Sequence, residues 1–115
     1  MQEERRGLRL AFNARAEVAP EGSPGKTVVG TVTSLSLNGC FIQISASFPS
    51  NALISVKILQ EGASFEGKAR VVHVQAGSGI GISFREVRPY SQSVLQKWIL
   101  AAMRGQPPKS NPPGA

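Results

Sequence analysis

Apolar and polar residues alternate over much of the chain, as they do in strands that bury one face and leave the other in water. The clearest run starts at Leu8, where every second residue up to Val18 is apolar, with Arg9, Asn13 and Glu17 between them. Shorter runs of the same kind, separated by turn residues, predict five further strands, at residues 27–33, 40–44, 52–59, 65–74 and 80–84. Six short strands joined by compact turns predict an all-β domain, either an antiparallel barrel or a sandwich.

The spacing of the apolar residues changes after Pro89 from every second position to that of a helix. The residues that repeat in this way are Val94, Leu95, Trp98, Ile99, Ala102 and Met103. We predict a helix over about residues 90–104 that packs this apolar stripe against the strands. Ser91 or Ser93 is suited to cap the start of the helix, and Gly105 is suited to end it.

The two ends of the sequence differ from the part between them. Residues 105–115 contain four prolines and no large apolar side chain, which predicts a disordered tail. Residues 1–104 are enough for one hydrophobic core, so we predict a single domain. No stretch approaches the roughly 18 to 20 consecutive apolar residues of a transmembrane segment. The charged first residues lead into no apolar segment typical of a signal peptide, so we expect a cytoplasmic protein.

The sequence is poor in the residues that enzymes most often use for catalysis, with one cysteine, Cys40, one histidine, His73, and no aspartate. Cys40 lies in an apolar stretch, which favours a small buried side chain over a nucleophile paired with His73. One cysteine and one histidine do not supply the three or four ligands of a zinc site. We therefore expect a binding protein, not an enzyme, with no metal and no resident cofactor.

The chain is strongly basic, with 13 Lys and Arg against 7 acidic residues and a formal net charge of +6. Such a balance is compatible with a barrel that binds nucleic acid through its charge. However, aromatic residues make up only 6% of the chain and most of them lie at expected core positions. Few remain to stack on bases, so we expect neither DNA nor RNA as a partner.

Three arginines, Arg5, Arg6 and Arg9, lie within five residues at the start of the first predicted strand. The planar guanidinium donates two parallel hydrogen bonds, which suits phosphate oxygens and the O6 and N7 edge of guanine. Guanidinium planes also stack on bases. Taken alone, the segment is also typical of a solvated basic terminus that aids solubility.

A second polar segment, from Ser34 to Gly39, joins the second and third predicted strands and ends in Asn-Gly, a strong turn signal. Hydroxyl and backbone groups in such a turn can hydrogen-bond the edge of a base, and Gly39 permits close approach. An ordinary hairpin connection explains the same residues, and this segment alone favours that simpler interpretation.

Together the two segments resemble the motifs of the PilZ domain, a bacterial family that combines Arg-x-x-x-Arg with Asp/Asn-x-Ser-x-x-Gly. The strands around residues 71–74 and 79–84 and the C-terminal helix are similar as well, so the resemblance covers about residues 3–104. It implies an all-β fold with a C-terminal helix, a six-stranded antiparallel β-barrel of the split-barrel type. It also implies a receptor for the bacterial second messenger cyclic di-GMP.

The resemblance assigns cyclic di-GMP binding to particular residues of this sequence. Arg5 and Arg9 match the two motif arginines, and Arg6 between them would add a phosphate contact. Ser36 would contact the ligand and Gly39 would shape the turn.

The family also implies a switch at the N-terminus. Residues 1–9 would form a mobile segment that becomes ordered when the messenger binds. The ordered segment would create a new surface for an effector protein, which the sequence does not identify.

Ser34 departs from the family pattern, which has Asp or Asn at this position. An aspartate accepts hydrogen bonds from N1 and N2 of guanine together, whereas a single hydroxyl cannot. Losing one good hydrogen bond costs about 1 to 3 kcal/mol, or roughly 5- to 150-fold in affinity. Two interpretations remain: a stand-alone cyclic di-GMP receptor in which Ser34 contacts the ligand, and a PilZ-like interaction module that binds nucleotide weakly or not at all.

Overall fold

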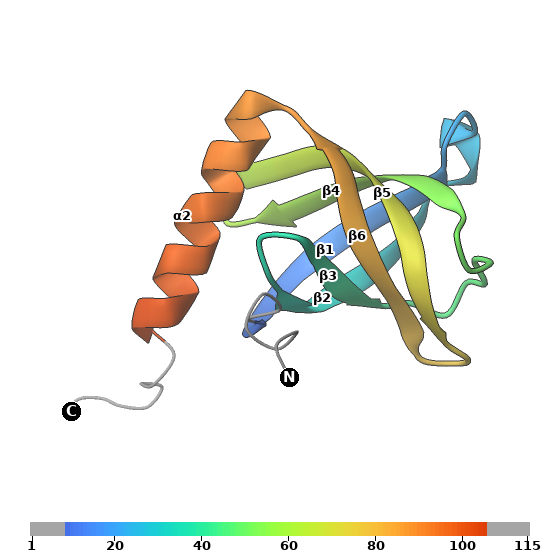
Figure 1. Ribbon diagram of the computed structural model, residues 1–115, viewed down its shortest axis with the longest axis horizontal. Helices are drawn as coiled ribbons and strands as arrows, with labels where there is room; N and C mark the ends of the chain where they lie inside the picture. Colours follow the sequence, from blue (N-terminus) through green and yellow to red (C-terminus); the bar gives the residue numbers. More distant parts are fainter. Residues whose placement is uncertain (1–8, 106–115) are drawn as a thin grey trace.

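Six antiparallel strands close into a barrel, and one helix packs along its outside (Figure 1). The computed structural model of the chain describes residues 9–105. Its elements are β1 (Leu10–Pro20), the short 3₁₀ turn η1 (Pro24–Lys26), β2 (Val28–Leu35), β3 (Gly39–Gln43), β4 (Leu53–Gln60), β5 (Ala63–Gln75), β6 (Gly79–Val87) and α2 (Pro89–Gly105). Neighbouring strands follow the order β1-β2-β3-β6-β5-β4, and β4 pairs with β1 to close the barrel. Of the barrel and the sandwich that the strand pattern allowed, the barrel is confirmed.

The core is built from side chains at alternate positions of the strands, as the sequence pattern predicts. On β4 the buried residues are Ile54, Val56 and Ile58, which alternate with more exposed ones. Phe65 on β5 is fully buried, and its ring centre lies 4.8 Å from that of Phe84 on β6. Burying a large apolar side chain contributes about 1.5 to 3 kcal/mol, so this interior supplies most of the driving force for folding.

A two-residue turn joins β4 to β5 and sets their register. Glu61 and Gly62 both have positive φ, 48° and 83°, and Gln60 pairs with Ala63 across them. Two central residues with positive φ are typical of the type I′ hairpin, whose twist matches that of the flanking strands. The turn predicted at Glu61-Gly62 is therefore confirmed.

Some strands extend beyond their predicted ends. The sequence analysis placed Leu35 in the turn after the second strand, which is wrong. Leu35 is fully buried at the end of β2, where it pairs with Leu10 of β1 and Cys40 of β3. Pairing on both sides keeps the chain extended where the side-chain alternation has already broken down. In the same way β6 continues to Val87 instead of ending at Phe84.

Helix α2 packs against β5 and β1 through the predicted apolar stripe. The ring of Trp98 is 5.3 Å from that of Phe12 on β1, centre to centre, and Trp98 is only 7% exposed. Met103, which the spacing placed in the same stripe, is 49% exposed. Met103 lies in the last turn of α2, and the end of this helix extends past the barrel in Figure 1.

The predicted serine cap of the helix is wrong. The helix begins at Pro89, ahead of both Ser91 and Ser93. A proline suits the first helical position because its φ is already helical and it has no N–H to satisfy. Ser91 is buried in the first turn, where its Oγ accepts a hydrogen bond from the backbone N–H of Glu66 on β5 at 2.9 Å. This serine therefore ties the helix to the barrel.

Within residues 9–105 no helix is long and apolar enough to cross a membrane. The predicted disordered tail lies outside the described residues except for Gly105, where α2 ends. Leu8, the predicted start of the first strand, also lies outside them.

We expect Trp98→Ala to lower the free energy of unfolding by about 3 to 5 kcal/mol, because it opens a cavity between α2 and Phe12. Leu100→Ala is the matched control, since Leu100 is 53% exposed on the same helix. This variant should change the free energy of unfolding by less than about 0.5 kcal/mol. Urea unfolding followed by circular dichroism measures both. Losses of equal size would contradict the role given to Trp98.

Candidate functional site

Ser36 organises the turn between β2 and β3. Its backbone N–H donates to the carbonyl oxygen of Gly39 at 2.9 Å, which closes the turn. Its Oγ accepts hydrogen bonds from the backbone N–H groups of Asn38 and Gly39, each at 3.2 Å, and lies 3.2 Å from the Gly39 carbonyl oxygen. Ser36 is only 7% exposed. Its hydroxyl therefore holds the backbone of the turn from the inside.

Gly39 allows β3 to come very close to β6. It pairs with Ser83, and a Cβ atom at this position would overlap the carbonyl oxygen of Ile82. Neither Asn38 nor Gly39 has positive φ, so the Asn-Gly pair does not form the left-handed turn that its sequence suggests. The close approach that Gly39 permits is used by the backbone of β6.

Ser34 lies on β2 just before this turn and is half-buried. It pairs with Ala11 of β1 on one side and Phe41 of β3 on the other. The register shifts next to Ser34 in both ladders. Such bulges bend a strand and redirect its side chains, and they are common beside binding sites.

Arg9 brings the two predicted motifs together in space. Its Nη1 donates to the Oγ of Ser34 at 3.3 Å, although the two residues are 25 positions apart in the sequence. Arg9 is exposed, so the rest of its guanidinium faces solvent. Of the predicted ligand-binding residues, Arg9 and Ser34 are thus in contact, and Ser36 and Gly39 form the adjoining turn. The other two, Arg5 and Arg6, lie outside the described residues.

Cys40 lies directly after Gly39 and is a buried part of the core, as predicted. Burial raises the pKa of its thiol to about 12, even though the nearby Arg9 guanidinium lowers that pKa in part. A thiol with such a pKa stays protonated and is a poor nucleophile. His73 is exposed on β5 and provides no buried partner for it.

Comparison of the sequence with known protein families identifies the family of the chain. The family model described as the PilZ domain matches residues 2–101 of the chain. The chain belongs to the PilZ domain family. None of the curated proteins compared with it matched.

Solved structures share the fold of this PilZ domain. The PilZ domain of CeSA from a cellulose-synthesizing bacterium is 19% identical, with a TM-score of 0.64 over 82% of this chain and 96% of that one. The PilZ domain of YcgR from Escherichia coli, solved with c-di-GMP, is 14% identical, with a TM-score of 0.70 over 90% and 94%. The Bacillus subtilis inhibitor of motility, MotI/DgrA, is 16% identical, with a TM-score of 0.70. That match covers 90% of this chain and 52% of the inhibitor, so this chain spans about half its length.

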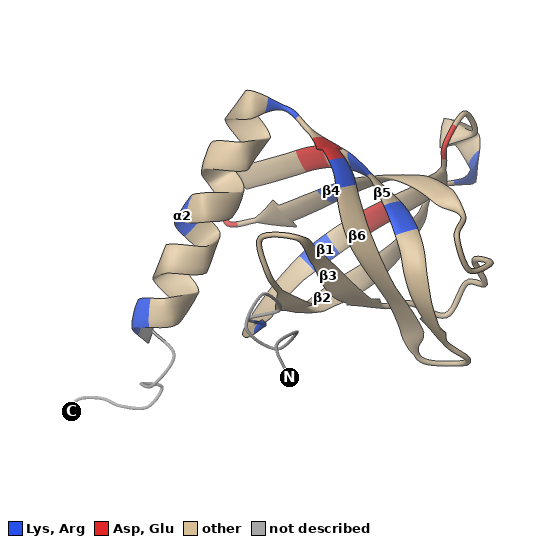
Figure 2. Cartoon of the chain, in the orientation of Figure 1, with Lys and Arg blue, Asp and Glu red and all other residues tan. Residues whose placement is uncertain are grey.

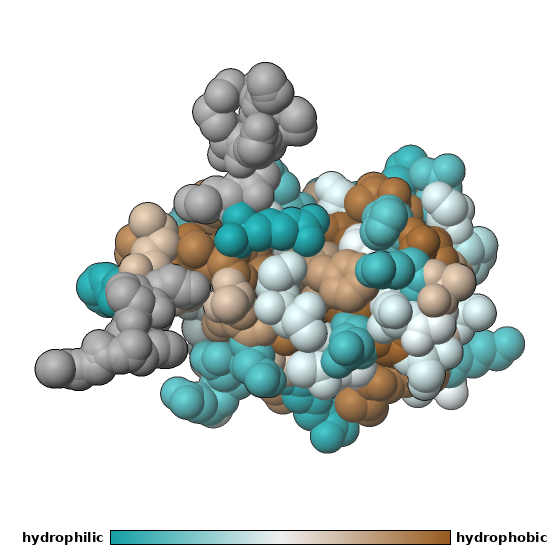
Figure 3. All heavy atoms as spheres, turned by 90° about the horizontal axis from the view of Figure 1, so that it is seen from below, coloured by the Kyte–Doolittle hydropathy of each residue, from teal (hydrophilic) through white to brown (hydrophobic). Residues whose placement is uncertain are grey.

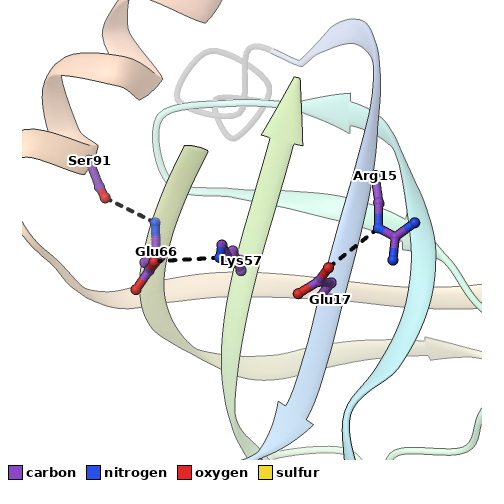
Figure 4. A network of polar contacts seen from close by, with 5 residues as sticks. All are labelled: Arg15, Glu17, Lys57, Glu66 and Ser91. Carbon is purple, nitrogen blue, oxygen red and sulfur yellow. Dashed lines mark hydrogen bonds and ion pairs between the residues drawn. The ribbon is translucent and has the colours of Figure 1, made fainter. Parts of the chain in front are cut away.

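A concave region elsewhere on the PilZ barrel contains none of the motif residues. It is an open groove of about 720 Å³ across β1, β4, β5 and β6. Glu17, Lys57 and Glu66 lie opposite one another in a row across three strands of this groove. Figure 4 shows that Lys57 contacts Glu66, at 4.0 Å, while Glu17 contacts Arg15, at 3.4 Å. These charges largely compensate one another, so the groove presents no field of one sign.

The alignment of these charges across the groove is not evident from the sequence, because it depends on the register between strands. The same region holds no metal-binding group, since among residues 9–105 no three histidine, cysteine or carboxylate side chains gather as metal ligands do.

We expect Gly39→Ala to destabilise the PilZ barrel by about 1 to 3 kcal/mol, because the added methyl overlaps the Ile82 carbonyl oxygen. Gly25→Ala in η1 is the matched control, since a Cβ atom there meets nothing within 4 Å, and its effect should stay within about 0.5 kcal/mol. Thermal unfolding of both variants is the measurement. If Gly39→Ala is as stable as Gly25→Ala, the close approach of β3 to β6 is not a constraint.

Cys40 should make stability depend on alkaline pH. The folded protein keeps the thiol protonated up to about pH 12, whereas the unfolded chain loses this proton near pH 9.0. Between these values the unfolded state binds fewer protons, so stability falls as pH rises. We expect the wild type to lose about 1 kcal/mol more than Cys40→Ala between about pH 8.5 and 10, in urea unfolding. If both proteins lose the same unfolding free energy over this pH range, burial does not raise the pKa of the Cys40 thiol as described.

Proposed function

We propose that this PilZ domain is a stand-alone receptor that binds cyclic di-GMP and relays its presence to a protein effector. The relay would consist of ordering the N-terminal segment that contains Arg5, Arg6 and Arg9 against the β2–β3 turn. The observation that carries the proposal is the contact between Arg9 and Ser34, because it unites the two motif segments at one place on the barrel. The YcgR PilZ domain, which has the same fold and was solved with c-di-GMP, supports this choice of ligand.

The turn would act as a preformed support for the nucleotide. Ser36 already has three backbone groups within hydrogen-bond distance of its hydroxyl, and Gly39 is fixed against β6. We therefore assign the contribution of Ser36 mainly to holding the turn, which leaves the exposed residues Leu37 and Asn38 facing the ligand. A support that is already rigid loses little conformational entropy when the ligand binds.

Arg9 would exchange its partner on binding. In the unliganded domain its guanidinium donates one hydrogen bond of 3.3 Å to the uncharged hydroxyl of Ser34, so only the donor of this bond is charged. A charged bond to a phosphate or a two-pronged bond to guanine is stronger, so the exchange favours the complex. With Asp in place of Ser34, an ion pair would hold Arg9 more firmly. Compared with Asp, Ser34 is a poorer acceptor for guanine, which lowers ligand affinity. Its weaker hold on Arg9 in the free protein offsets part of that loss.

The same residue supports a second candidate function. Ser34 cannot accept from N1 and N2 of guanine together, so the domain could instead be an interaction module that has lost most nucleotide affinity. In that case the barrel would bind its effector without the messenger. In either role we propose a cytoplasmic binding protein that performs no catalysis and needs no resident cofactor.

Isothermal titration of the full chain with cyclic di-GMP tests the proposal. We expect binding by the wild type with a Kd below about 100 μM, and a loss of roughly 10- to 150-fold in Arg9→Ala, because a charged hydrogen bond is removed. Arg9→Lys should lose nearly as much, since an ammonium keeps the charge without the planar fork. Arg15→Ala is the control, because Arg15 is another exposed arginine, on β1, that contacts Glu17 and not Ser34.

Ser34→Asp separates the two candidate functions in the same titration. A silent wild type together with a binding Ser34→Asp variant would show an interaction module that has lost its ligand. If neither protein produces heat, cyclic di-GMP is not the ligand of this domain.

A further inference from the structure

Strand β5 is longer than the strand that covers its edge. Its pairing with β4 runs from Ala63 to Arg70, where Arg70 lies opposite Leu53. One residue further, Val71 still exchanges backbone hydrogen bonds with Asn51 and Ala52, at 2.7 and 2.9 Å. Asn51 then adopts a φ of 71°, a left-handed conformation that turns the chain. Along this edge of β5, backbone pairing therefore ends at Val71.

The last four residues of β5, Val72–Gln75, form an edge that we call the outer edge. On one side they pair with β6 through His73, Val74 and Gln75. On the other side no strand within residues 9–105 pairs with them. All four residues are exposed, Val72 to 54% and Val74 to 42%. The hairpin of β5 and β6 extends away from the rest of the barrel in Figure 1.

The outer edge lacks the usual protection against pairing with other chains. Natural sheets shield free edges with charged side chains, especially lysine, or with proline. Residues 71–84 contain no Lys, Arg, Asp, Glu or Pro, and the end of the hairpin is uncoloured in Figure 2. A bulge between Val71 and His73 twists the strand but lies before its last three residues, which pair regularly. An unprotected edge with two exposed valines is a template for β-strand addition.

Apolar area alone does not identify this surface. On the face shown in Figure 3, brown apolar atoms are scattered among polar ones, as on most protein surfaces. The outer edge differs because backbone groups are available there together with apolar side chains. Its partner strand β6 contributes Gly81 opposite His73 and Gly79 opposite Gln75, so no bulky side chain from β6 stands beside these two positions.

The charge around the outer edge indicates the kind of partner. Arg70 precedes it and His73 lies within it, and both are exposed. No acidic residue occurs between Glu66 and Glu86, so the positive charge of Arg70 has no acidic neighbour along the hairpin. A second copy of the chain would bring the same basic residues and another net charge of +6 to the interface, and like charges oppose such pairing. A strand with acidic residues complements them.

We propose that the outer edge, Val72–Gln75, binds an extended segment of a partner protein that carries apolar residues with acidic neighbours, and that this segment adds a strand beside β5. Backbone hydrogen bonds would supply affinity, and Val72, Val74 and Arg70 would supply selectivity. This inference goes beyond the proposed function, because none of the predicted ligand-binding residues lies on the outer edge. It names the surface through which an effector docks, with or without the messenger.

A short blocked peptide of alternating valine and glutamate is the probe, titrated into the ¹⁵N-labelled full chain and followed by amide chemical shifts. We expect saturable shifts at residues 72–75. A peptide with lysine in place of glutamate should bind roughly three- to tenfold more weakly, because it places like charges opposite each other. Val74→Glu should abolish the shifts by placing a charge on the edge. Val29→Glu should not, since Val29 is 53% exposed on β2 but lies between two paired strands.

Three results would overturn the inference. Shifts that are absent at millimolar peptide or fall outside the hairpin would show that the edge is not a docking site. Equal binding of the two peptides would remove the charge selectivity. A wild-type dimer in sedimentation that Val74→Glu dissociates would assign the edge to a second copy of the chain. Because cyclic di-GMP takes no part in the titration, its outcome is independent of whether the domain binds the messenger.

Discussion

The contact between β3 and β6 at Gly39 is the constraint on which the candidate site depends. The two backbones are so close that no side chain fits between them, and the neighbouring Asn38 carbonyl oxygen accepts from the N–H of Phe84 at 2.8 Å. The β2–β3 turn is therefore attached to β6, the neighbouring strand, as well as to its own hairpin. Ser36 completes this fixation with hydrogen bonds inside the turn. A turn held in this way is a rigid platform at the rim of the barrel.

The platform gives Arg9 a defined hydrogen-bond partner. Arg9 reaches Ser34 immediately before β1 enters the barrel. The single hydrogen bond to an uncharged hydroxyl places the guanidinium there and is weaker than the bonds that a charged ligand offers. The outer edge of β5 belongs to a different part of the barrel and contains none of the predicted ligand-binding residues, so ligand binding and partner docking need not compete for the same residues.

Much of this architecture could be predicted from the sequence because a barrel separates inside from outside at every second residue. That rule located six strands, and helical spacing located α2 and the packing of Trp98. It failed where three-dimensional pairing overrides side-chain pattern: Leu35 continues β2 because both neighbours pair with it, and Ser91 bonds to β5 instead of capping its helix. The family motifs assigned Arg9 and Ser34 to one ligand site, but their direct contact was not predicted, because spacing alone does not reveal strand register.

The most direct test of the account is the ¹H–¹⁵N spectrum of the full chain with and without cyclic di-GMP. The account predicts that shifts concentrate at Arg9 and at residues 34–39, while the amides of the groove residues 55–57 and 66–68 and of the outer edge stay in place. Shifts centred on the groove, or no shifts at all for both the wild type and Ser34→Asp, would contradict the claim that the β2–β3 turn and the N-terminal arginines form the binding site.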